Sequence, residues 1–138
     1  ISFDEFEDHV RYKLKFLEFA PVVTVSAKTG LRIDKILPQV EKIYQEYSRR
    51  IPTATLNECF ERAIQKNPMS SYRGKFMKLF YATQVKKQPP TFKCFLNFPE
   101  GIHFSYRRYL INSLRKRFGF SGTPVRLILS GKRKGIDS

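Results

Sequence analysis

The sequence has 138 residues, of which 41% are apolar and 14% aromatic, and this is enough to bury one modest hydrophobic core. It contains no run of 18 apolar residues and its first residues, 1–5, are acidic, so we expect a soluble chain with no membrane span or targeting segment. The net charge of +14 is uneven, because residues 1–50 hold 9 Lys and Arg against 8 Asp and Glu, whereas residues 51–138 hold 17 against 4. This step predicts a domain boundary near residue 50, followed by a module that contacts a polyanion or, alternatively, carries only a solvated basic surface.

The two cysteines are predicted to be free thiols. Cys59 and Cys94 lie far apart, each within an apolar periodic segment. Such positions are typical of buried, reduced cysteines. We therefore expect no disulfide bond and a cytoplasmic location.

The chain begins with a predicted helix and a predicted strand. Apolar residues recur at helical spacing from Phe3 to Leu17, with acidic residues in the first turns. Pro21 ends this pattern. The β-branched run at residues 22–25 then predicts a short, buried and parallel strand.

A loop and a second helix are predicted next. Residues 26–30 form the loop, and helical spacing resumes over residues 33–47, with Pro38 placing the regular helix at or after itself. A buried parallel strand needs neighbouring strands and helices on both faces of its sheet, and this segment supplies only one strand and two helices. We therefore expect the end of an α/β domain whose front is missing. The alternative is that residues 22–25 join the later strands in a single mixed sheet.

A linker and a third helix follow. Residues 49–52 are polar and contain a proline, which is typical of a linker. Thr55 and Glu58 have the spacing of a capping box, so we expect the helix to begin there. The apolar stripe that follows ends at residues 67–68.

Residues 76–85 and 91–98 predict two antiparallel strands, joined by a proline-rich connection at residues 86–90. One predicted face carries Met77, Leu79, Tyr81, Phe92, Cys94, Leu96 and Phe98. The other predicted face carries Phe76, Phe80, Ala82 and Phe95 among lysines. Both faces are therefore expected to be aromatic.

The last predicted elements are a helix over residues 104–118 and a third strand from residue 125. Residues 119–124, rich in glycine and ending in proline, predict the turn between them. The order helix, strand, strand, helix, strand predicts a small α+β unit with a three-stranded sheet and helices on one face.

Several short segments together resemble one family. Ser26-Ala27-Lys28, placed directly after a predicted buried strand, resembles the fifth guanine-nucleotide motif of Ras-like GTPases. The segments that resemble the EngA/Der pattern are residues 20–23, 26–30, 51–53, 56–57, 81–85, 89–92, 103–110 and 118–124. Because they occur in the right order over nearly the whole chain, the sequence resembles the bacterial EngA/Der family of ribosome-assembly GTPases.

This resemblance implies the end of a P-loop GTPase domain, which is an α/β fold, followed by an α+β KH-like domain. It predicts the C-terminal part of the second GTPase domain at residues 1–50, the KH-like domain at 51–130 and a basic tail at 131–138. It also implies that the intact protein is a monomeric GTPase that binds GTP or GDP with magnesium. Its expected partners are the large ribosomal subunit, with its rRNA, and its own GTPase domains.

The resemblance implies a guanine contact but no catalysis by these residues alone. The sequence contains no G-x-x-x-x-G-K-[ST], D-x-x-G or N-K-x-D motif, so we expect no bound cofactor and no GTP hydrolysis from this stretch. Ser26, Ala27 and Lys28 are the implied guanine-binding residues, with the Ala27 N–H aimed at the guanine O6. An ordinary strand-to-helix loop is the alternative.

Basic side chains are the candidates for RNA contact, through charge rather than sequence readout. They are Lys86, Lys87, Arg108, Arg115, Lys116, Lys132, Arg133 and Lys134. The G-x-x-G of residues 119–122 matches the loop with which KH domains clamp nucleic acid. Its place before a strand nevertheless favours a helix stop over such a clamp.

Phe80 and Phe95 are predicted to form an interdomain docking surface, with core packing and base stacking as alternatives. His9 and His103 have no partner at ligand spacing, so no metal site is expected. No catalytic constellation can be assigned either, which argues against an independent RNA-modifying enzyme.

The sequence therefore predicts a fragment of a GTP-binding ribosome biogenesis factor whose KH-like domain contacts rRNA, docks on the GTPase domains, or does both. The rival hypothesis is a purely protein-binding domain that regulates the GTPase without touching RNA. In the first case, nucleotide state would alter the packing of the missing domains on the KH-like sheet and so expose or cover the basic surface.

Overall fold

A computed structural model describes residues 2–131 of the chain. The elements are α1 (Phe3–Lys13), η1 (Lys15–Leu17), η2 (Ile33–Lys35), α2 (Ile36–Tyr47), α3 (Thr53–Lys66), β1 (Leu79–Lys86), β2 (Thr91–Leu96), η3 (Pro99–Gly101), α4 (Phe104–Phe118) and β3 (Arg126–Ser130). None of the helices within residues 2–131 is both long enough and apolar enough to cross a membrane.

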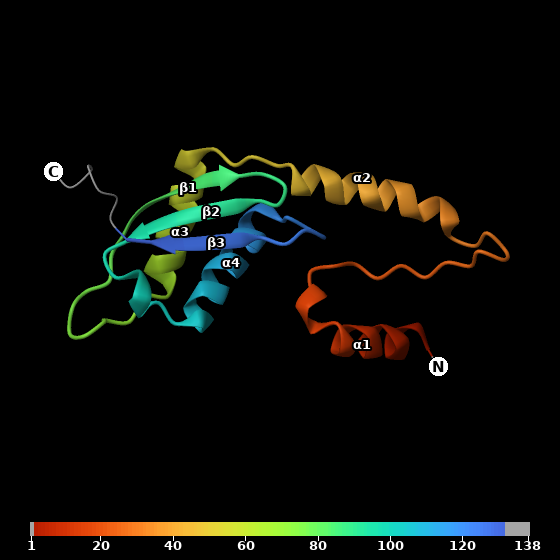
Figure 1. Cartoon of the computed structure of the whole chain (residues 1–138), viewed down its shortest axis with the longest axis horizontal. Coiled ribbons are helices and arrows are strands. Elements are labelled where there is room, and N and C mark those ends of the chain that lie inside the picture. The colour runs from red at the N-terminus through yellow and green to blue at the C-terminus, as the bar shows by residue number, and fades with distance from the viewer. Residues whose placement is uncertain (1, 132–138) are drawn as a thin grey trace.

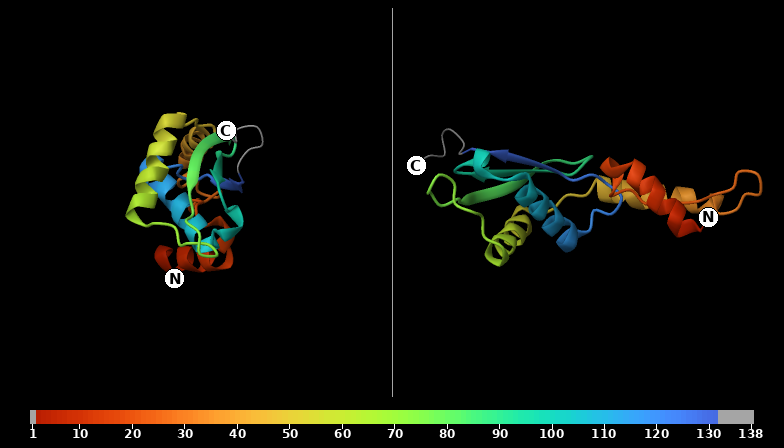
Figure 2. Two further views of the ribbon diagram at one scale, coloured as in Figure 1. Left: turned by 90° about the vertical axis from the view of Figure 1, so that its left-hand side faces the viewer. Right: turned by 90° about the horizontal axis from the view of Figure 1, so that it is seen from below.

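The three strands form one mixed sheet in the order β1-β2-β3. β1 and β2 are antiparallel, whereas β2 and β3 are parallel and are connected through α4. Figure 1 and Figure 2 show α3 and α4 side by side on one face of this sheet. The predicted α+β class, with three strands and helices on one face, is confirmed.

The hydrophobic core lies between the sheet and the α3–α4 layer. It consists of Ile51, Leu56, Cys59, Phe60, Ala63, Ala82, Phe92, Cys94, Leu96, Leu110, Leu114, Phe118, Phe120, Val125 and Leu127. Its first residue is Ile51, and residues 2–50 contribute no buried side chain. The two parts of the described chain therefore differ sharply in packing.

The predicted faces of β1 are wrong at two residues. A register irregularity between Leu79 and Tyr81 pairs Tyr81 with Phe95 and Ala82 with Cys94. Ala82 therefore faces the core and Tyr81 the opposite side, the reverse of the assignment from strict alternation. The reason is that one extra residue at a β-bulge moves every following side chain to the other face.

Two helices begin earlier than predicted. α3 begins at Thr53 after Pro52, and no side chain caps its first turn, so the expected capping box of Thr55 and Glu58 is not formed. Instead, the Asn57 amide accepts a hydrogen bond from the Ala82 N–H (2.8 Å) and donates one to the Ala82 carbonyl (2.9 Å), which fixes α3 to β1. α2 begins at Ile36, and Pro38 is accommodated because N–H groups in a first turn need no helical partner.

The strand predicted at residues 22–25 is not formed. The described sheet contains only β1, β2 and β3, so the alternative in which residues 22–25 join those strands is also excluded. Val23 and Val25 are each 43% exposed. A β-strand needs a neighbouring strand for its backbone hydrogen bonds, and none lies beside this segment among residues 2–131.

α2 is attached to the sheet through the β1–β2 connection. The Gln88 side chain donates to the Tyr44 hydroxyl (3.2 Å) and the Ser48 hydroxyl (2.9 Å), and the Gln88 N–H donates to the Tyr47 carbonyl. α1 makes no comparable attachment among the described residues, and Figure 1 shows it on the far side of a long loop.

Candidate nucleic-acid interface

α3 and α4 run antiparallel and are joined by hydrogen bonds along their length. The Tyr109 hydroxyl donates to the Ala63 carbonyl (2.6 Å), and the Tyr106 hydroxyl donates to the Asn67 carbonyl (2.7 Å). At the other end, the Cys59 thiol lies 3.7 Å from the Ser113 carbonyl. These contacts fix which residues of the two helices face each other.

A groove of about 570 Å³ lies between the two helices on the side away from the sheet. We call it the α3–α4 groove. It is lined by Cys59, Arg62, Ala63, Lys66, Tyr109, Asn112, Ser113, Lys116 and Arg117. Four of these side chains are cationic and none is acidic, so the groove has a positive potential.

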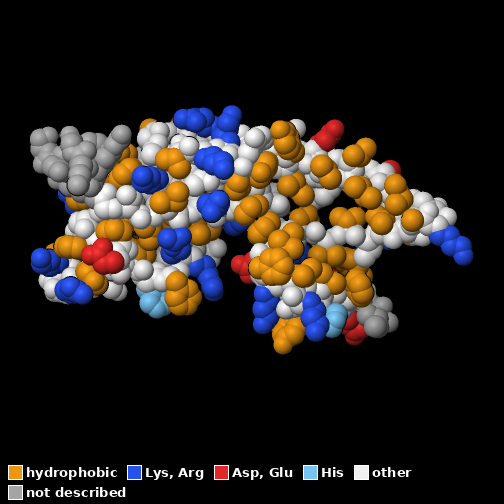
Figure 3. All heavy atoms as spheres, viewed as in Figure 1, with side chains coloured by type: hydrophobic (Ala, Val, Ile, Leu, Met, Phe, Trp, Pro, Cys, Tyr) orange, Lys and Arg blue, Asp and Glu red, His pale blue; other side chains and the backbone are white. Residues whose placement is uncertain are grey.

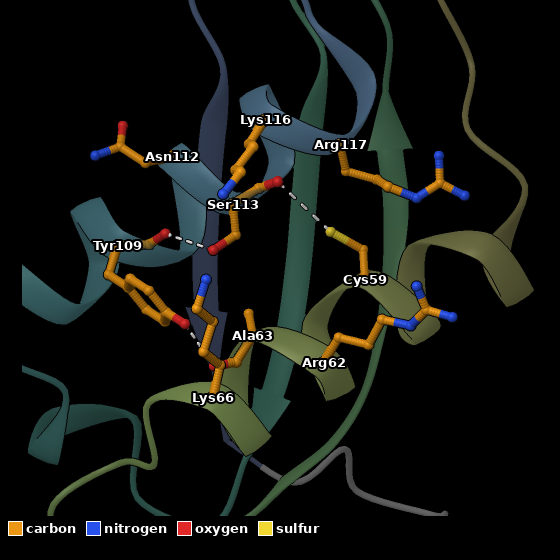
Figure 4. Close-up of a pocket in the computed structure, with 9 residues that line it drawn as sticks. All are labelled: Cys59, Arg62, Ala63, Lys66, Tyr109, Asn112, Ser113, Lys116 and Arg117. Carbon is orange, nitrogen blue, oxygen red and sulfur yellow. Dashed lines mark hydrogen bonds between the residues drawn. The ribbon is translucent and has the colours of Figure 1, made fainter.

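The four cations come in equal numbers from the two helices (Figure 4). Lys66 of α3 and Lys116 of α4 both extend into the space between the helices, whereas Arg62 and Arg117 lie beside Cys59. Of these four cations, only Arg62 has a carboxylate partner in the described part of the chain, Glu58 at 2.7 Å, and that pair is exposed. An exposed ion pair of this kind contributes little to stability, and it leaves the Arg62 guanidinium accessible to a ligand.

The two cysteines differ in their surroundings. Burial raises the pKa of Cys59, and the neighbouring Arg117 and Arg62 oppose this rise. Burial raises the pKa of Cys94 to about 12, against a smaller lowering by Arg107. Both cysteines are free and buried, as predicted, and Cys59 is the one that borders the groove.

The predicted RNA-binding residues do not share one surface. Lys116 lines the groove, whereas Arg108 lies over the Phe104 ring at 5.8 Å, near the beginning of α4. Lys86 and Lys87 are exposed at the β1–β2 connection. Lys132, Arg133 and Lys134 lie outside the described residues. The RNA role of each of these residues stays a prediction.

Arg115 has a structural role in the loop after α4. Its guanidinium donates to the carbonyls of Phe120 (2.9 Å) and Thr123 (2.8 Å), and burial lowers its pKa. Phe120 itself is fully buried in the core. Arg115 is therefore less available for phosphate contact than its position on the helix surface predicts.

The G-x-x-G loop is a helix stop, as predicted. Gly119, with φ of 96°, ends α4 and donates its N–H to the Arg115 carbonyl at 2.8 Å. Gly122, with φ of 81°, packs under Ile43 of α2. α2 thus packs against the loop at Gly122, while Gly119 and Ser121 stay exposed.

The predicted guanine-binding loop is a compact turn. The Gly30 N–H donates to the Ser26 carbonyl (2.8 Å), and the Ser26 N–H donates to the Leu31 carbonyl (3.0 Å). Ala27 and Lys28 are exposed at its tip. The Ala27 N–H, which is the group predicted to meet the guanine O6, donates no hydrogen bond within residues 2–131.

The outer face of the sheet carries the two aromatics predicted for docking. Phe95 is only 6% exposed, because it stacks on Tyr81 with ring centroids 4.6 Å apart. Phe80 is 40% exposed and lies under the Lys78 ammonium at 5.7 Å. Phe95 is thus covered by Tyr81 although it does not belong to the hydrophobic core, and docking through Phe80 and Phe95 stays a prediction.

Residues 50–129 match the family model described as the KH-domain-like of EngA bacterial GTPase enzymes, C-terminal. This match covers more than half of the chain. The chain belongs to the EngA/Der family.

Curated relatives in this family are named GTPase Der. The protein from Moorella thermoacetica is 46% identical over 133 residues, covering 96% of this chain. The one from Caldanaerobacter subterraneus subsp. tengcongensis is 45% identical over 136 residues, covering 99%, and the one from Desulforapulum autotrophicum is 48% identical over 132 residues, covering 96%. These matches confirm the resemblance to the C-terminal region of EngA/Der proteins.

The chain spans about 30% of the length of these EngA/Der relatives, 30% of the first two and 27% of the third. The family model covers residues 50–129, and the full-chain matches extend the likeness into the first part of the chain. The activity, substrates and partners of the whole protein are therefore matters of proposal.

Sequence reasoning missed three of the four groove cations. Arg62 and Lys66 stand four residues apart on α3, and Arg117 follows Lys116 on α4, so each pair was visible as a local pattern. The pairs alone do not predict a common groove, because the register of α3 against α4 was not known. Within residues 2–131 no group of three His, Cys, Asp or Glu side chains is placed to hold a metal.

Proposed function

We propose that this chain is part of a GTP-binding ribosome biogenesis factor, and that its KH-like domain contacts the rRNA of the large ribosomal subunit. The observation that carries this proposal is the charge of the KH-like domain. Residues 51–131 hold 14 Lys and Arg against 3 Asp and Glu, and α4 holds five cations and no acid. Such a surface attracts the phosphate backbone of RNA, whatever the base sequence of the RNA is.

The nucleotide chemistry belongs to the intact protein in this proposal. GTP or GDP with magnesium binds the GTPase domains, and the turn at residues 26–30 supplies the Ala27 N–H to the guanine base. α2 begins six residues after this turn and is bonded to the β1–β2 connection through Gln88. A change at the nucleotide would thus reach the KH-like domain through a short connection held by hydrogen bonds.

Co-sedimentation of the chain with large ribosomal subunits across a salt series tests the RNA contact. We expect binding at low ionic strength that weakens steeply toward physiological salt, because each phosphate contact releases counterions. Arg108→Glu with Lys116→Glu should abolish it. Lys35→Glu with Lys42→Glu, which makes the same charge change at exposed positions of η2 and α2, should retain most of it. Absence of binding by the unchanged chain at low salt would contradict the proposal.

Docking on the GTPase domains without RNA contact is the second candidate function. It is favoured by the apolar side chains left on the outer face and edge of the sheet, where Phe80 is 40% and Ile128 44% exposed. Apolar docking depends weakly on salt, so salt-insensitive association of the chain with separately expressed GTPase domains would support this function. If the intact protein binds ribosomal particles equally with GDP, a GTP analogue and no nucleotide, the proposed switch fails.

A further inference from the structure

We infer that the α3–α4 groove holds the phosphodiester backbone of a single RNA strand. This inference rests on the proposed rRNA contact and gives that contact a place in the fold. It moves the contact from the scattered basic residues predicted from sequence to Arg62, Lys66, Lys116 and Arg117, which come together only in the folded chain.

Four cationic residues line one groove, and no carboxylate is among its lining residues. Figure 4 shows Lys66 and Lys116 extending into the space between the helices, while the Arg62 and Arg117 guanidinium groups lie together on its other side. The Lys66 and Lys116 ammonium groups enter the same space from opposite helices, and their mutual repulsion opposes the packing that brings them there. A bound polyanion with more than one phosphate relieves this repulsion. The equal division of the cations between α3 and α4 suits an extended anion that runs along the groove.

The neutral groups of the groove fit a strand of RNA. Asn112 is exposed at the rim of the groove, where its amide can donate to a phosphate or accept from a ribose hydroxyl. Ser113 already donates to the Tyr109 carbonyl at 2.9 Å, and the Tyr109 hydroxyl is bonded to Ala63. The lining is therefore held rigidly by bonds within the protein, while the charged tips remain available to the ligand.

The G-x-x-G loop does not offer a competing backbone clamp. A Cβ at Gly122 would lie 2.5 Å from Ile43 Cγ1, and the Glu46 carboxylate approaches Gly119. The apolar contact at Gly122 leaves little room for a phosphate there, and the Glu46 carboxylate, which is paired with Arg49 at 3.3 Å, adds negative charge beside Gly119. A second hollow, of about 500 Å³, is lined by Arg107, Arg108 and Arg115, but it also contains the carboxylate of Glu18, whereas no acidic residue lines the α3–α4 groove. The space between two packed helices is narrow enough to admit one strand but not a duplex.

The decisive experiment is fluorescence anisotropy with a labelled oligouridylate and the full 138-residue chain, repeated over a range of salt concentrations. Lys66→Gln with Lys116→Gln removes two groove cations. For a single strand, the slope of log affinity against log salt should fall by about 0.7 for each cation lost, hence about 1.4 for the pair. The affinity lost between 50 and 200 mM salt then shrinks by about sevenfold relative to the unchanged chain.

Three further variants control this result. Lys35→Gln with Lys42→Gln has the same net charge as the groove pair but should keep the full slope. Lys86→Gln with Lys87→Gln tests the rival site at the β1–β2 connection and should also keep it. Lys66→Arg with Lys116→Arg preserves the charges and should bind as the unchanged chain does, since phosphate is recognised here by charge. Thermal unfolding of each variant verifies that it folds.

The outcomes separate this inference from the proposed function. Suppose that the Lys66→Gln, Lys116→Gln variant binds RNA with the same salt slope as the original chain, and that the original chain still co-sediments with large subunits. The groove assignment is then overturned and the rRNA contact stands. If the unchanged chain binds neither RNA nor subunits, both are overturned. Equal affinity for duplex RNA, or competition by pyrophosphate at the same concentration as the oligonucleotide, would show a different ligand and also overturn the assignment.

Discussion

The two parts of this chain contain similar apolar patterns but very different packing. α1 and α2 have apolar stripes at helical spacing and bury no residue, whereas α3 and α4 bury seven between them. The difference arises because α3 and α4 lie on the β-sheet, whereas within residues 2–131 no sheet lies against α1 or α2. An apolar stripe indicates that a helix has a face suited to burial, but that face is buried only where a sheet or another helix packs against it.

The largest test of this contrast compares two phenylalanines. Phe60 of α3 is 0% exposed, and Phe16, in the first part of the chain, is 74% exposed. Phe60→Ala should lower the free energy of unfolding by about 3–5 kcal/mol, because it removes buried surface and leaves a cavity. Phe16→Ala should change it by less than about 0.5 kcal/mol. Denaturant unfolding of both variants measures the difference, and equal effects would contradict the contrast.

A smaller effect is expected where the two parts meet. The buried Gln84 side chain accepts from the Ile51 N–H (2.7 Å) and donates to the Arg49 carbonyl (2.9 Å). Gln84→Ala should lower the free energy of unfolding by about 1–3 kcal/mol, since it leaves the buried Ile51 N–H without a hydrogen-bond partner. Gln88→Ala, which removes only exposed hydrogen bonds, is the matched control and should cost less than about 0.5 kcal/mol. A Gln84→Ala variant as stable as this control would show that water replaces the lost bonds.

The smallest effect tests the contact between α2 and the loop after α4. Gly122 and Gly74 both have positive φ, at 81° and 75°, but a Cβ would meet Ile43 only at Gly122. Each Gly→Ala change should lower the free energy of unfolding by about 1–2 kcal/mol through backbone strain. Gly122→Ala should lower it further, because the new Cβ has to displace the Ile43 side chain. Adding Ile43→Ala to the Gly122→Ala variant should remove only this additional loss of stability, which thermal unfolding of the double variant measures. Equal losses at the two glycines would show that α2 does not press on this loop.

The elements predicted most accurately from sequence are those with local signals. The helix expected at residues 104–118 matches α4, because apolar spacing and Gly119 mark both its face and its end. The faces of β1 were wrong from Tyr81 onward, since a bulge depends on the pairing with β2 and leaves no mark in the alternation. The expected strand at residues 22–25 failed for a related reason, because its existence depends on a neighbouring strand.

The candidate site shows the same division. Lys116 was predicted from its place on a basic helix face, and its neighbour Arg115 was predicted with it on equal grounds. In the fold, Arg115 bonds the carbonyls of the loop that follows α4, while Lys116 points into the groove. Two adjacent cations on one helix have separate roles because their side chains point in directions that differ by about 100°.

The sequence by itself determined the α+β class, the position of α4, the basic character of the second part and membership of the EngA/Der family. These follow from composition, periodicity and short motifs, which are properties of neighbouring residues. Only the tertiary structure decided that Arg62 and Lys66 share a groove with Lys116 and Arg117. That arrangement depends on the antiparallel register of α3 and α4, fixed by the hydroxyls of Tyr106 and Tyr109 and by the sheet beneath them, and such long-range distances are not encoded in any local pattern.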